Sequence, residues 1–306
     1  MALAPEIVAS ASFVSWWQAA ILGVVEGITE YLPISSTGHL IIASSLMGLD
    51  RTPEHKEAID AFNIVIQGGA ILAVLGLYRE RVLQMIRGGL GRDREGLKLG
   101  ANIFIAFLPA AVLGVLLNHH IEARLFYAGP VLAALFLGGI FMMVIDRWKI
   151  TPHRTSDGDI EGTIDLTAMT WRQALFIGLM QCVAMWPGMS RSMMTISGGV
   201  LIGLKPKQAA EFSFLLGLPT LGGACVYRLY KNMRNDGPNM FDVIGVMPII
   251  VGMLVATVSA MLAVRWLVAF LTRHGLTPFG WYRIGLCVVL GALWWQGVVQ
   301  ISPDVP

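Results

Sequence analysis

The sequence predicts an all-α integral membrane protein arranged as an inverted-topology repeat, with six transmembrane helices and two re-entrant helix hairpins. The first observation is composition: 55% of the 306 residues are hydrophobic and only 14% are charged, whereas soluble domains carry about 25% charged residues. The second is a series of apolar stretches close to the about 20 residues that a spanning helix needs. The third is that the two halves of the chain place similar residues in the same order.

The first apolar region, 16–49, is broken in its middle by the polar segment 33–38 (PISSTG). Each arm is shorter than a comfortable span, so we predict a re-entrant hairpin whose turn lies at membrane depth. Irregular backbone is tolerated there only where protein buries it or where it lines a cavity. The alternative is a full span over the uncharged residues 7–25. Trp16 and Trp17 favour the hairpin, because tryptophan anchors helices at the membrane interface.

A second broken region, 173–204, is interrupted at 187–192 (PGMSRS) and predicts the second hairpin. Six further stretches lack Lys, Arg, Asp and Glu and approach the length of a full span. Most of them contain glycine or proline, which membrane helices tolerate. The six predicted spans are 61–78, 99–118, 125–145, 212–227, 243–264 and 284–302.

The internal repeat is visible at an offset of 155 residues, where Gln18 corresponds to Gln173 and Ser35 to Ser190. Each half contains one hairpin and three spans. Because three is odd, the second half inserts upside down relative to the first, a plan that places a site near the midplane. We therefore predict one membrane domain, 1–306, with pseudo-repeats at about 7–148 and about 170–302 joined by a polar linker, 149–169.

The distribution of Lys and Arg predicts the orientation in the membrane. Loop 79–98 contains six of them, and its side of the predicted topology collects 14 against six on the far side. Basic loops stay in the cytoplasm, so both termini are predicted on the outer side. The first hairpin then enters from outside and the second from inside. The N-terminal residues lack the basic segment of a signal peptide, so we expect no cleavage.

Several other classes of protein fit the sequence poorly. The net charge of +2 is too small to suggest nucleic-acid binding. The three cysteines, Cys182, Cys225 and Cys287, lie far apart in apolar segments and predict packing residues rather than a metal or redox motif. No Walker sequence is present, which argues against nucleotide-driven chemistry.

Glu26 and Glu30 form the first candidate constellation. Their spacing of four places them on one helix face, about 6 Å apart along the axis. Two such carboxylates repel each other when both are ionised, so a cation, a shared proton or an arginine must compensate. A hard divalent ion that also touches phosphate oxygens is a plausible partner. The alternative is a pair of pore-lining or interhelical hydrogen-bonding carboxylates.

The residues after the proline, Ser35, Ser36, Thr37 and Gly38, predict the start of a new half-helix. Its free backbone N–H groups and positive dipole end would bind phosphate or carboxylate. The alternative is a plain helix cap. His39 is the histidine that lies inside an apolar segment and can act as general acid, general base or nucleophile. It can also be a core histidine bonded to a carbonyl.

A second polar cluster centres on Arg191, which lies between a Pro-Gly pair and an apolar run and is flanked by two serines. An arginine at membrane depth needs an anion, and its planar guanidinium suits phosphate through paired hydrogen bonds. The alternative is a structural ion pair with Glu26 or Glu30. Gln181 stands where the first half has Glu26 and can hydrogen-bond without adding charge. We expect the two clusters to meet and form one anion site.

Residues 26–39 (EGITEYLPISSTGH) resemble the first signature of the bacterial undecaprenyl-diphosphate phosphatases, the bacitracin-resistance family. Residues 186–192 (WPGMSRS), followed by Thr195, are similar to its second signature, and the likeness covers most of the chain. Met193 and Met194 depart from the smaller residues expected there, which concerns packing more than chemistry. The resemblance implies a membrane fold of inverted repeats with two re-entrant hairpins.

The resemblance also implies hydrolysis of undecaprenyl diphosphate to undecaprenyl phosphate and inorganic phosphate in the bacterial cytoplasmic (inner) membrane. This recycles the lipid carrier for peptidoglycan and other envelope polymers and confers bacitracin resistance. By motif, Glu26 and Glu30 hold a divalent cation, Mg²⁺ or Ca²⁺, or position water. Ser36 is the candidate nucleophile with His39 as acid/base partner, or His39 is itself the nucleophile, and Arg191 holds the diphosphate. The residues implied to bind substrate are Ser35, Thr37, Gly38, Gln181, Gly188, Ser190, Ser192 and Thr195.

The implied partners are a polyprenyl diphosphate lipid and the bilayer, without nucleic acid and with a homo-oligomer left open. A polyprenyl-phosphate flippase is the main alternative, because inverted repeats and broken helices are transporter traits and transport also needs an anion site. Ser36 and His39 separate the two functions, since transport requires no nucleophile or proton donor. A small-anion channel is disfavoured, because Glu26 and Glu30 would repel a permeating anion.

Overall fold

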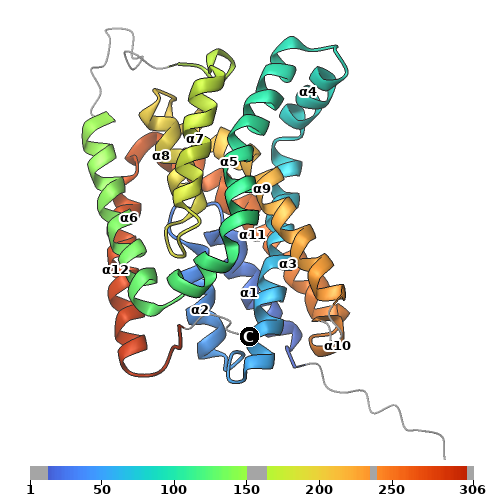
Figure 1. The fold of residues 1–306 in the computed structure, drawn as a ribbon, viewed down its shortest axis with the longest axis vertical. Coiled ribbons are helices and arrows are strands. Elements are labelled where there is room, and N and C mark those ends of the chain that lie inside the picture. The colour runs from blue at the N-terminus through green and yellow to red at the C-terminus, as the bar shows by residue number, and fades with distance from the viewer. Residues whose placement is uncertain (1–12, 150–163, 235–239, 302–306) are drawn as a thin grey trace, which may run out of the picture.

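The structure, a computed structural model, describes residues 13–149, 164–234 and 240–301. Within these ranges the regular elements are helices, with one isolated bridge between Ile164 and Leu204. Five helices there are long and apolar enough to cross a membrane. They form a bundle of roughly upright helices (Figure 1). The predicted class, an all-α integral membrane protein that crosses the membrane several times, is confirmed at this level.

Five predicted spans correspond to these long helices. Each helix extends beyond its apolar stretch at one or both ends, because flanking polar residues continue or cap it. At the start of the first, for example, the Thr52 hydroxyl accepts a hydrogen bond from the backbone N–H of His55 at 3.2 Å. The five helices are α3 (Pro53–Leu77), α5 (Arg94–Leu125), α6 (Ala128–Lys149), α9 (Pro206–Arg234) and α11 (Val246–His274).

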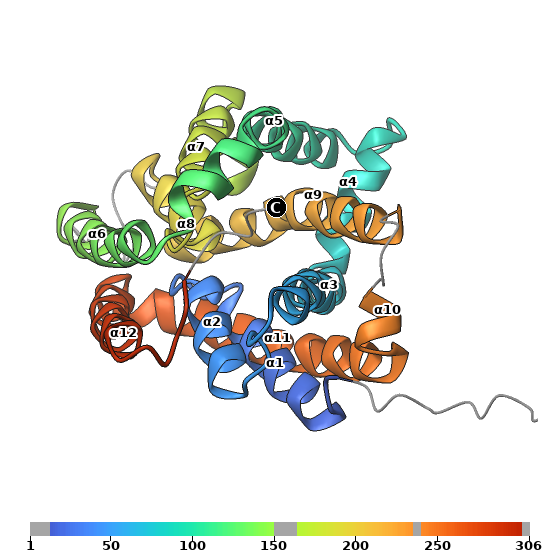
Figure 2. The ribbon, with the colours of Figure 1, turned by 60° about the horizontal axis from the view of Figure 1, so that its bottom comes forward.

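The sixth predicted span, 284–302, is shifted in the structure. Helix α12 (Thr277–Trp295) begins earlier and ends earlier than predicted. It ends just before Gly297, whose φ of 72° is the left-handed conformation that commonly terminates helices. The helix lies beside α6 (Figures 1 and 2). It also contains Arg283, and it is not among the five helices apolar enough to count as spans by composition.

Both predicted breaks divide their apolar regions into pairs of short helices. The first region forms α1 (Trp16–Thr29) and α2 (Ser36–Leu46), and the second forms α7 (Trp171–Val183) and α8 (Arg191–Leu201). In Figure 1 the pair α1 and α2 occupies the lower half of the molecule and the pair α7 and α8 the upper half. Each pair turns back in the middle of the bundle, so the two turns face each other.

The two hairpins repeat each other in local detail. Helix α1 begins with a capping box between Ser15 and Gln18, and α7 begins with the same arrangement between Thr170 and Gln173. The last residue before the second helix of each hairpin has a positive φ, 75° at Ser35 and 71° at Ser190. These are the two non-glycine residues with positive φ in the described ranges. Such backbone is strained and marks a site that the surrounding structure enforces.

Each hairpin packs on a long helix from the other half of the chain. Helix α1 lies along α11 and α7 lies along α5, while α3 and α9 pack together between them (Figure 2). Glycines allow these close approaches: a Cβ added at Gly23 would lie 2.5 Å from the Gly252 carbonyl oxygen. One added at Gly178, 155 residues after Gly23, would collide with the Ala106 carbonyl oxygen.

The remaining elements are short. They are α4 (Arg79–Gly89), which folds beside the start of α5, the 3₁₀ turn η1 (Leu166–Ala168) and α10 (Met240–Val243). The predicted polar linker 149–169 falls largely on residues 150–163, which lie outside the described ranges, as do residues 7–12 and 302.

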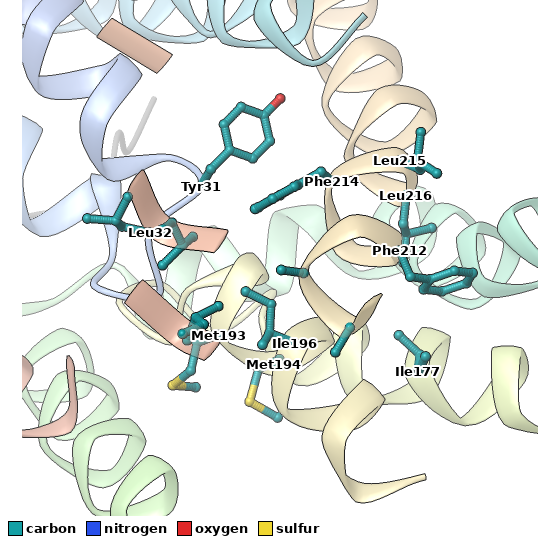
Figure 3. Close-up of a cluster of buried hydrophobic side chains, with 14 of the residues drawn as sticks. Tyr31, Leu32, Ile177, Met193, Met194, Ile196, Phe212, Phe214, Leu215 and Leu216 are labelled. Carbon is teal, nitrogen blue, oxygen red and sulfur yellow. The ribbon is translucent and has the colours of Figure 1, made fainter. Parts of the chain in front are cut away.

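The largest hydrophobic core joins the turns of the two hairpins to α9. Figure 3 shows the rings of Tyr31, from the first turn, and Phe214 of α9 beside each other, with Met193 and Met194 of α8 farther along the same cluster. The rings of Tyr31 and Phe214 meet edge to face with centroids 5.2 Å apart. Met193 and Met194 are both buried here, so the larger side chains at these positions are absorbed by packing. This core holds the two turns against each other.

Candidate active site

Glu30 lies at the end of α1, where it joins the two sequence clusters. The residue is 6% exposed. Both oxygens of its carboxylate accept hydrogen bonds. Ser36 Oγ donates to Oε2 at 2.9 Å and Gln67 Nε2 donates to the same atom at 3.1 Å. Arg191 Nη2 donates to Oε1 at 3.2 Å, forming a buried ion pair. The predicted meeting of the two clusters is therefore present in the structure.

Arg191 is the first residue of α8, directly after the strained Ser190. Besides the ion pair with Glu30, its Nη1 donates to the Ser213 carbonyl at 2.9 Å. Its guanidinium lies 5.5 Å from the centre of the Tyr31 ring, in a cation–π position. The Nε atom is buried and has no hydrogen-bond partner among the described residues. Arg191 thus retains one donor for another acceptor, and the ion pair with Glu30 that the sequence offered as an alternative is present.

The serines and the threonine of the second cluster cross-link the two turns. Ser192 Oγ donates to the Leu32 carbonyl at 2.9 Å and lies 3.0 Å from Ser190 Oγ. Thr195 Oγ1 lies 2.6 Å from Ser213 Oγ. Ser192 and Thr195 have no exposed surface. In the structure these three side chains bond to other protein groups, and their role in substrate binding stays a prediction.

Three other predicted substrate residues are also engaged or enclosed. Gly188 has a φ of 94°, and its carbonyl accepts a hydrogen bond from Arg283 at 2.8 Å. Gly38 is buried, and a Cβ there would lie in ordinary contact with Leu286, 3.5 Å away. Gln181 is 2% exposed, and its Nε2 has no partner among the described residues. These positions support the two turns rather than line an open surface.

His39 does not pair with Ser36. Its Nδ1 lies 2.7 Å from the Ser35 carbonyl oxygen and its Nε2 lies 2.7 Å from the hydroxyl of Tyr282. Because a carbonyl only accepts, Nδ1 carries the proton in this arrangement. The Ser36 hydroxyl donates to Glu30 instead. The structure therefore supplies Ser36 with a carboxylate acceptor where the sequence analysis expected an imidazole.

A cavity of about 340 Å³ adjoins the first turn. Its lining includes Glu26, Ser36 and Thr37 of the first cluster and the basic residues Lys56 and Arg228. The polar groups of the first cluster therefore face a space large enough for a phosphate group. The cavity lies at the end of the bundle where α2 ends and α3 begins.

The donor set beside this cavity suits a hard cation. Both carboxylate oxygens of Glu26 and the Oδ1 atom of Asn63 are buried without a hydrogen-bond partner among the described residues. Glu26 and Asn63 both line the cavity. Carboxylate and amide oxygens are the ligands that Mg²⁺ and Ca²⁺ prefer. The described residues contain no group of three or more His, Cys, Asp and Glu that could hold a metal, so a cation here would take amide or substrate oxygens as further ligands.

Comparison with known proteins gives the family of this chain. The sequence profile of the family described as bacitracin resistance protein BacA matches residues 19–289. The chain belongs to the BacA family. The family resemblance inferred from the two motifs is thereby confirmed.

Relatives within the family match over nearly their whole length. An undecaprenyl-diphosphatase of Sorangium cellulosum is 45% identical over 89% of this chain and 84% of its own. Undecaprenyl-diphosphatase 2 of Rhodospirillum rubrum is 48% identical over 93% and 97%. An undecaprenyl-diphosphatase of Pseudomonas syringae pv. tomato is 45% identical over 92% and 95%.

Several residues of this BacA-family site were not found by sequence reasoning. Gln67 is a polar residue inside a predicted span, and its position there was a usable signal. Arg283 and its neighbour Tyr282 stand directly before the predicted span 284–302 and were excluded from it. Ser213 contributes a backbone carbonyl to Arg191. No sequence pattern identifies a carbonyl that a distant side chain will use.

Proposed function

We propose that this chain hydrolyses undecaprenyl diphosphate to undecaprenyl phosphate and inorganic phosphate. This reaction regenerates the carrier lipid for peptidoglycan and other envelope polymers, and it confers resistance to bacitracin. The observation that carries the proposal is the linkage of Ser36, Glu30 and Arg191, which joins a hydroxyl, a base and a phosphate-binding cation inside a membrane protein. The relatives named undecaprenyl-diphosphatase support the same substrate and reaction.

Arg191 and the two helix starts bind the diphosphate in this mechanism. Helices α2 and α8 begin at Ser36 and Arg191, and their free backbone N–H groups and positive dipole ends favour an anion. The incoming phosphate replaces Glu30 as the partner of the Arg191 guanidinium. These donors stabilise the charge that spreads over the transferring phosphoryl group.

Ser36 is the nucleophile in this proposal. Its Oγ attacks the terminal phosphorus while its proton passes to Glu30 Oε2, the atom to which it already donates. The bond between that phosphorus and the bridging oxygen breaks, and undecaprenyl phosphate leaves with the proton from Glu30, which is again a carboxylate. Water then attacks the phosphoserine while Glu30 takes a proton from the water and passes it to Ser36 Oγ, which releases inorganic phosphate and restores the serine hydroxyl. His39 remains the alternative acid or nucleophile, once its Nε2 separates from Tyr282.

Glu26, with Glu30 and the Asn63 amide oxygen, would hold a divalent cation, Mg²⁺ or Ca²⁺. Bound there, the cation would neutralise charge on the diphosphate. The unpartnered oxygens of Glu26 and Asn63 support this assignment. The Glu26 carboxyl group lies in the cavity wall with Ser36. Its negative charge must be neutralised by a cation or by a proton.

The proposed topology is an inverted repeat in the bacterial inner membrane, with α12 as the sixth span and both hairpins re-entrant. The matched capping boxes, the paired positive-φ serines and the reciprocal packing of α1 and α7 support it. Both termini lie on the outer side in this proposal. Lys56 and Arg228, which belong to that side, line the cavity at the first turn, so the site opens outward.

One observation favours the flippase alternative. A second polar cavity, of about 640 Å³, lies at the opposite end of α3, where Arg79, Arg265 and the Arg81–Glu211 ion pair line it. Polar cavities that contain basic residues at both ends of an anion site suit alternating access. The flippase reading does not use the contact between Ser36 and Glu30, which is why the phosphatase is preferred.

The test is phosphate release from undecaprenyl diphosphate by the detergent-purified chain, with and without a chelator, beside Ser36→Ala and Arg191→Ala. We expect release from the wild type and little from either variant. If the wild type binds the lipid without releasing phosphate, and Arg191→Ala weakens that binding, the phosphatase is wrong. Transport in vesicles then becomes the function to measure.

A further inference from the structure

Two consecutive residues of α12 reach the two re-entrant turns separately. Arg283 Nη2 donates to the Gly188 carbonyl of the second turn at 2.8 Å and to the Ala134 carbonyl of α6 at 3.0 Å. The Tyr282 hydroxyl lies 2.7 Å from Nε2 of His39, just after the first turn. Neighbouring residues on a helix point about 100° apart, so α12 contacts both hairpins at one level.

Arg283 is an unusual residue for a membrane helix. It has no exposed surface, and none of the described residues forms an ion pair with it. Its Nε and Nη1 atoms have no hydrogen-bond partner among the described residues. A buried, unpaired charge destabilises a protein, and an ionisable residue inside the membrane marks function by default. Simple packing does not account for an arginine here.

The contact with Gly188 acts on the backbone that carries Arg191. Gly188 has a φ of 94°, and a Cβ added there would lie 2.8 Å from the Val131 carbonyl oxygen of α6. The turn is therefore pressed against α6. Ser190, two residues on, is strained at a φ of 71°. Arg283 binds the turn and α6 with one nitrogen, so it fixes the direction in which Arg191 leaves the turn.

The contact with His39 acts in the same way on the first turn. The His39 ring stacks on Tyr282 with centroids 5.6 Å apart and 9° between the ring planes. Its other nitrogen donates to the Ser35 carbonyl. Ser35 is strained at a φ of 75° and directly precedes Ser36. Tyr282 therefore holds, through one imidazole, the backbone that presents the Ser36 hydroxyl to Glu30.

We propose that Tyr282 and Arg283 are positioning residues that set the distance between the two half-sites. Arg283 holds the turn that carries Arg191, and Tyr282 holds the turn that carries Ser36. The catalytic groups themselves lie on separate hairpins, and α12 bonds to both through side chains, in addition to the direct bonds between the two turns. The effect on catalysis rests on the proposed phosphatase function, whereas the effect on binding of the lipid diphosphate does not.

The experiment compares Arg283→Met, Arg283→Lys and Tyr282→Phe in the full-length chain in detergent. Trp281→Phe is the matched control, because Trp281 is on the same helix and is 61% exposed. Phosphate release from undecaprenyl diphosphate gives kcat and KM, and thermal melting reports folding. The rise in melting temperature on adding undecaprenyl diphosphate reports binding without catalysis.

We expect Arg283→Met to lower kcat by roughly 10–100-fold, as removal of groups that orient a site commonly does. Arg283→Lys should recover part of the loss, since the ammonium can still bond one carbonyl. Tyr282→Phe, which keeps the ring and folds normally, should lower kcat about 10-fold. Trp281→Phe should match the wild type. In an Arg191→Lys background, Arg283→Met should lower kcat little further, because both changes weaken the same contact between the second turn and the diphosphate.

The proposal is wrong if Tyr282→Phe and folded Arg283→Lys retain wild-type kcat and wild-type stabilisation by lipid. It is also wrong if Arg283→Met multiplies the Arg191→Lys defect in full, since the arginine would then act independently of Arg191. A wild type that binds the lipid without releasing phosphate defeats the phosphatase instead. In that case a loss of lipid-induced stabilisation in both α12 variants still supports positioning, and its retention overturns it.

Discussion

The turns of the two hairpins have the same backbone plan and different chemistry. Each follows a capped helix of similar length and ends in a serine at positive φ, Ser35 or Ser190. The first turn carries Glu26 and Ser36, which line a cavity. The second places Arg191 at the equivalent helix start and Gln181 where the first has Glu26. The two hairpins share a backbone plan, while acid and hydroxyl stand on one and the cation on the other.

The opposite charges of the two turns explain how charged side chains can lie together in the apolar interior of the bundle. One turn contributes negative charge and the other positive charge, so Glu30 and Arg191 neutralise each other at 3.2 Å. Two identical turns would bring together either two carboxylates or two cations, and each pair would repel. The asymmetry is therefore a condition of stability as well as of catalysis.

The largest expected effect comes from removing the charge of Glu30 while keeping the shape of its side chain, because this abolishes the charge difference between the two turns. Glu30→Gln should lower kcat about 10²–10⁴-fold, the range for loss of a general base. It should also weaken the hold on Arg191, because an amide oxygen forms a weaker bond than a carboxylate. Phosphate release at saturating lipid measures the effect. Asp50→Asn, which changes a carboxylate on the outer cavity wall, is the control and should stay within twofold of wild type.

The reverse change removes the positive partner. Arg191→Ala should lower kcat/KM about 10²–10³-fold, as loss of one preorganised donor to the transferring group does. The kcat/KM of Arg191→Lys should lie between those of the wild type and Arg191→Ala, because lysine keeps the charge and loses the planar guanidinium group. Activity and lipid binding measured on the same preparations test this. A variant that is folded and keeps wild-type turnover without Arg191 would remove the central role assigned to the second turn.

The sequence predicted most of this arrangement because its signals are local. The breaks at 33–38 and 187–192 gave both hairpins, and the offset of 155 residues gave the pairing of Ser35 with Ser190. The meeting of Glu30 and Arg191 followed from electrostatics, since each needed a partner of opposite charge.

What the sequence did not predict depends on distant contacts. The partners of His39 are a carbonyl and Tyr282, which is 243 residues away. Arg283 seemed to flank a span because the apolar run begins after it, yet the helix starts at Thr277 and buries it. The last helix also ended early, because Gly297 adopts a left-handed conformation that composition does not reveal.

A subtler change makes the first turn resemble the second. Glu26→Gln places in the first half the amide that Gln181 supplies in the second. Its orphaned oxygens are the proposed cation ligands, so the variant should lose 10–100-fold in apparent affinity for Mg²⁺ or Ca²⁺, about the loss seen when groups around a metal are removed. The stabilisation of the purified protein by each cation measures affinity without activity. Unchanged stabilisation in Glu26→Gln, with Asp50→Asn as reference, would exclude Glu26 as a ligand.

The smallest expected effect concerns what the two hairpins share. Gly23→Ala and Gly178→Ala each force a methyl group against a backbone carbonyl of the neighbouring long helix, Gly252 in one case and Ala106 in the other. Overpacking of this kind typically destabilises by about 1–3 kcal/mol. Gly114→Ala is the control, because a Cβ there meets nothing within 4 Å. If both hairpins pack by one rule, the two variants should lower the melting temperature by similar amounts, with kcat of the folded fraction preserved. A large effect at only one site would show that the hairpins are held differently, and that the equivalence of the two halves stops at the backbone.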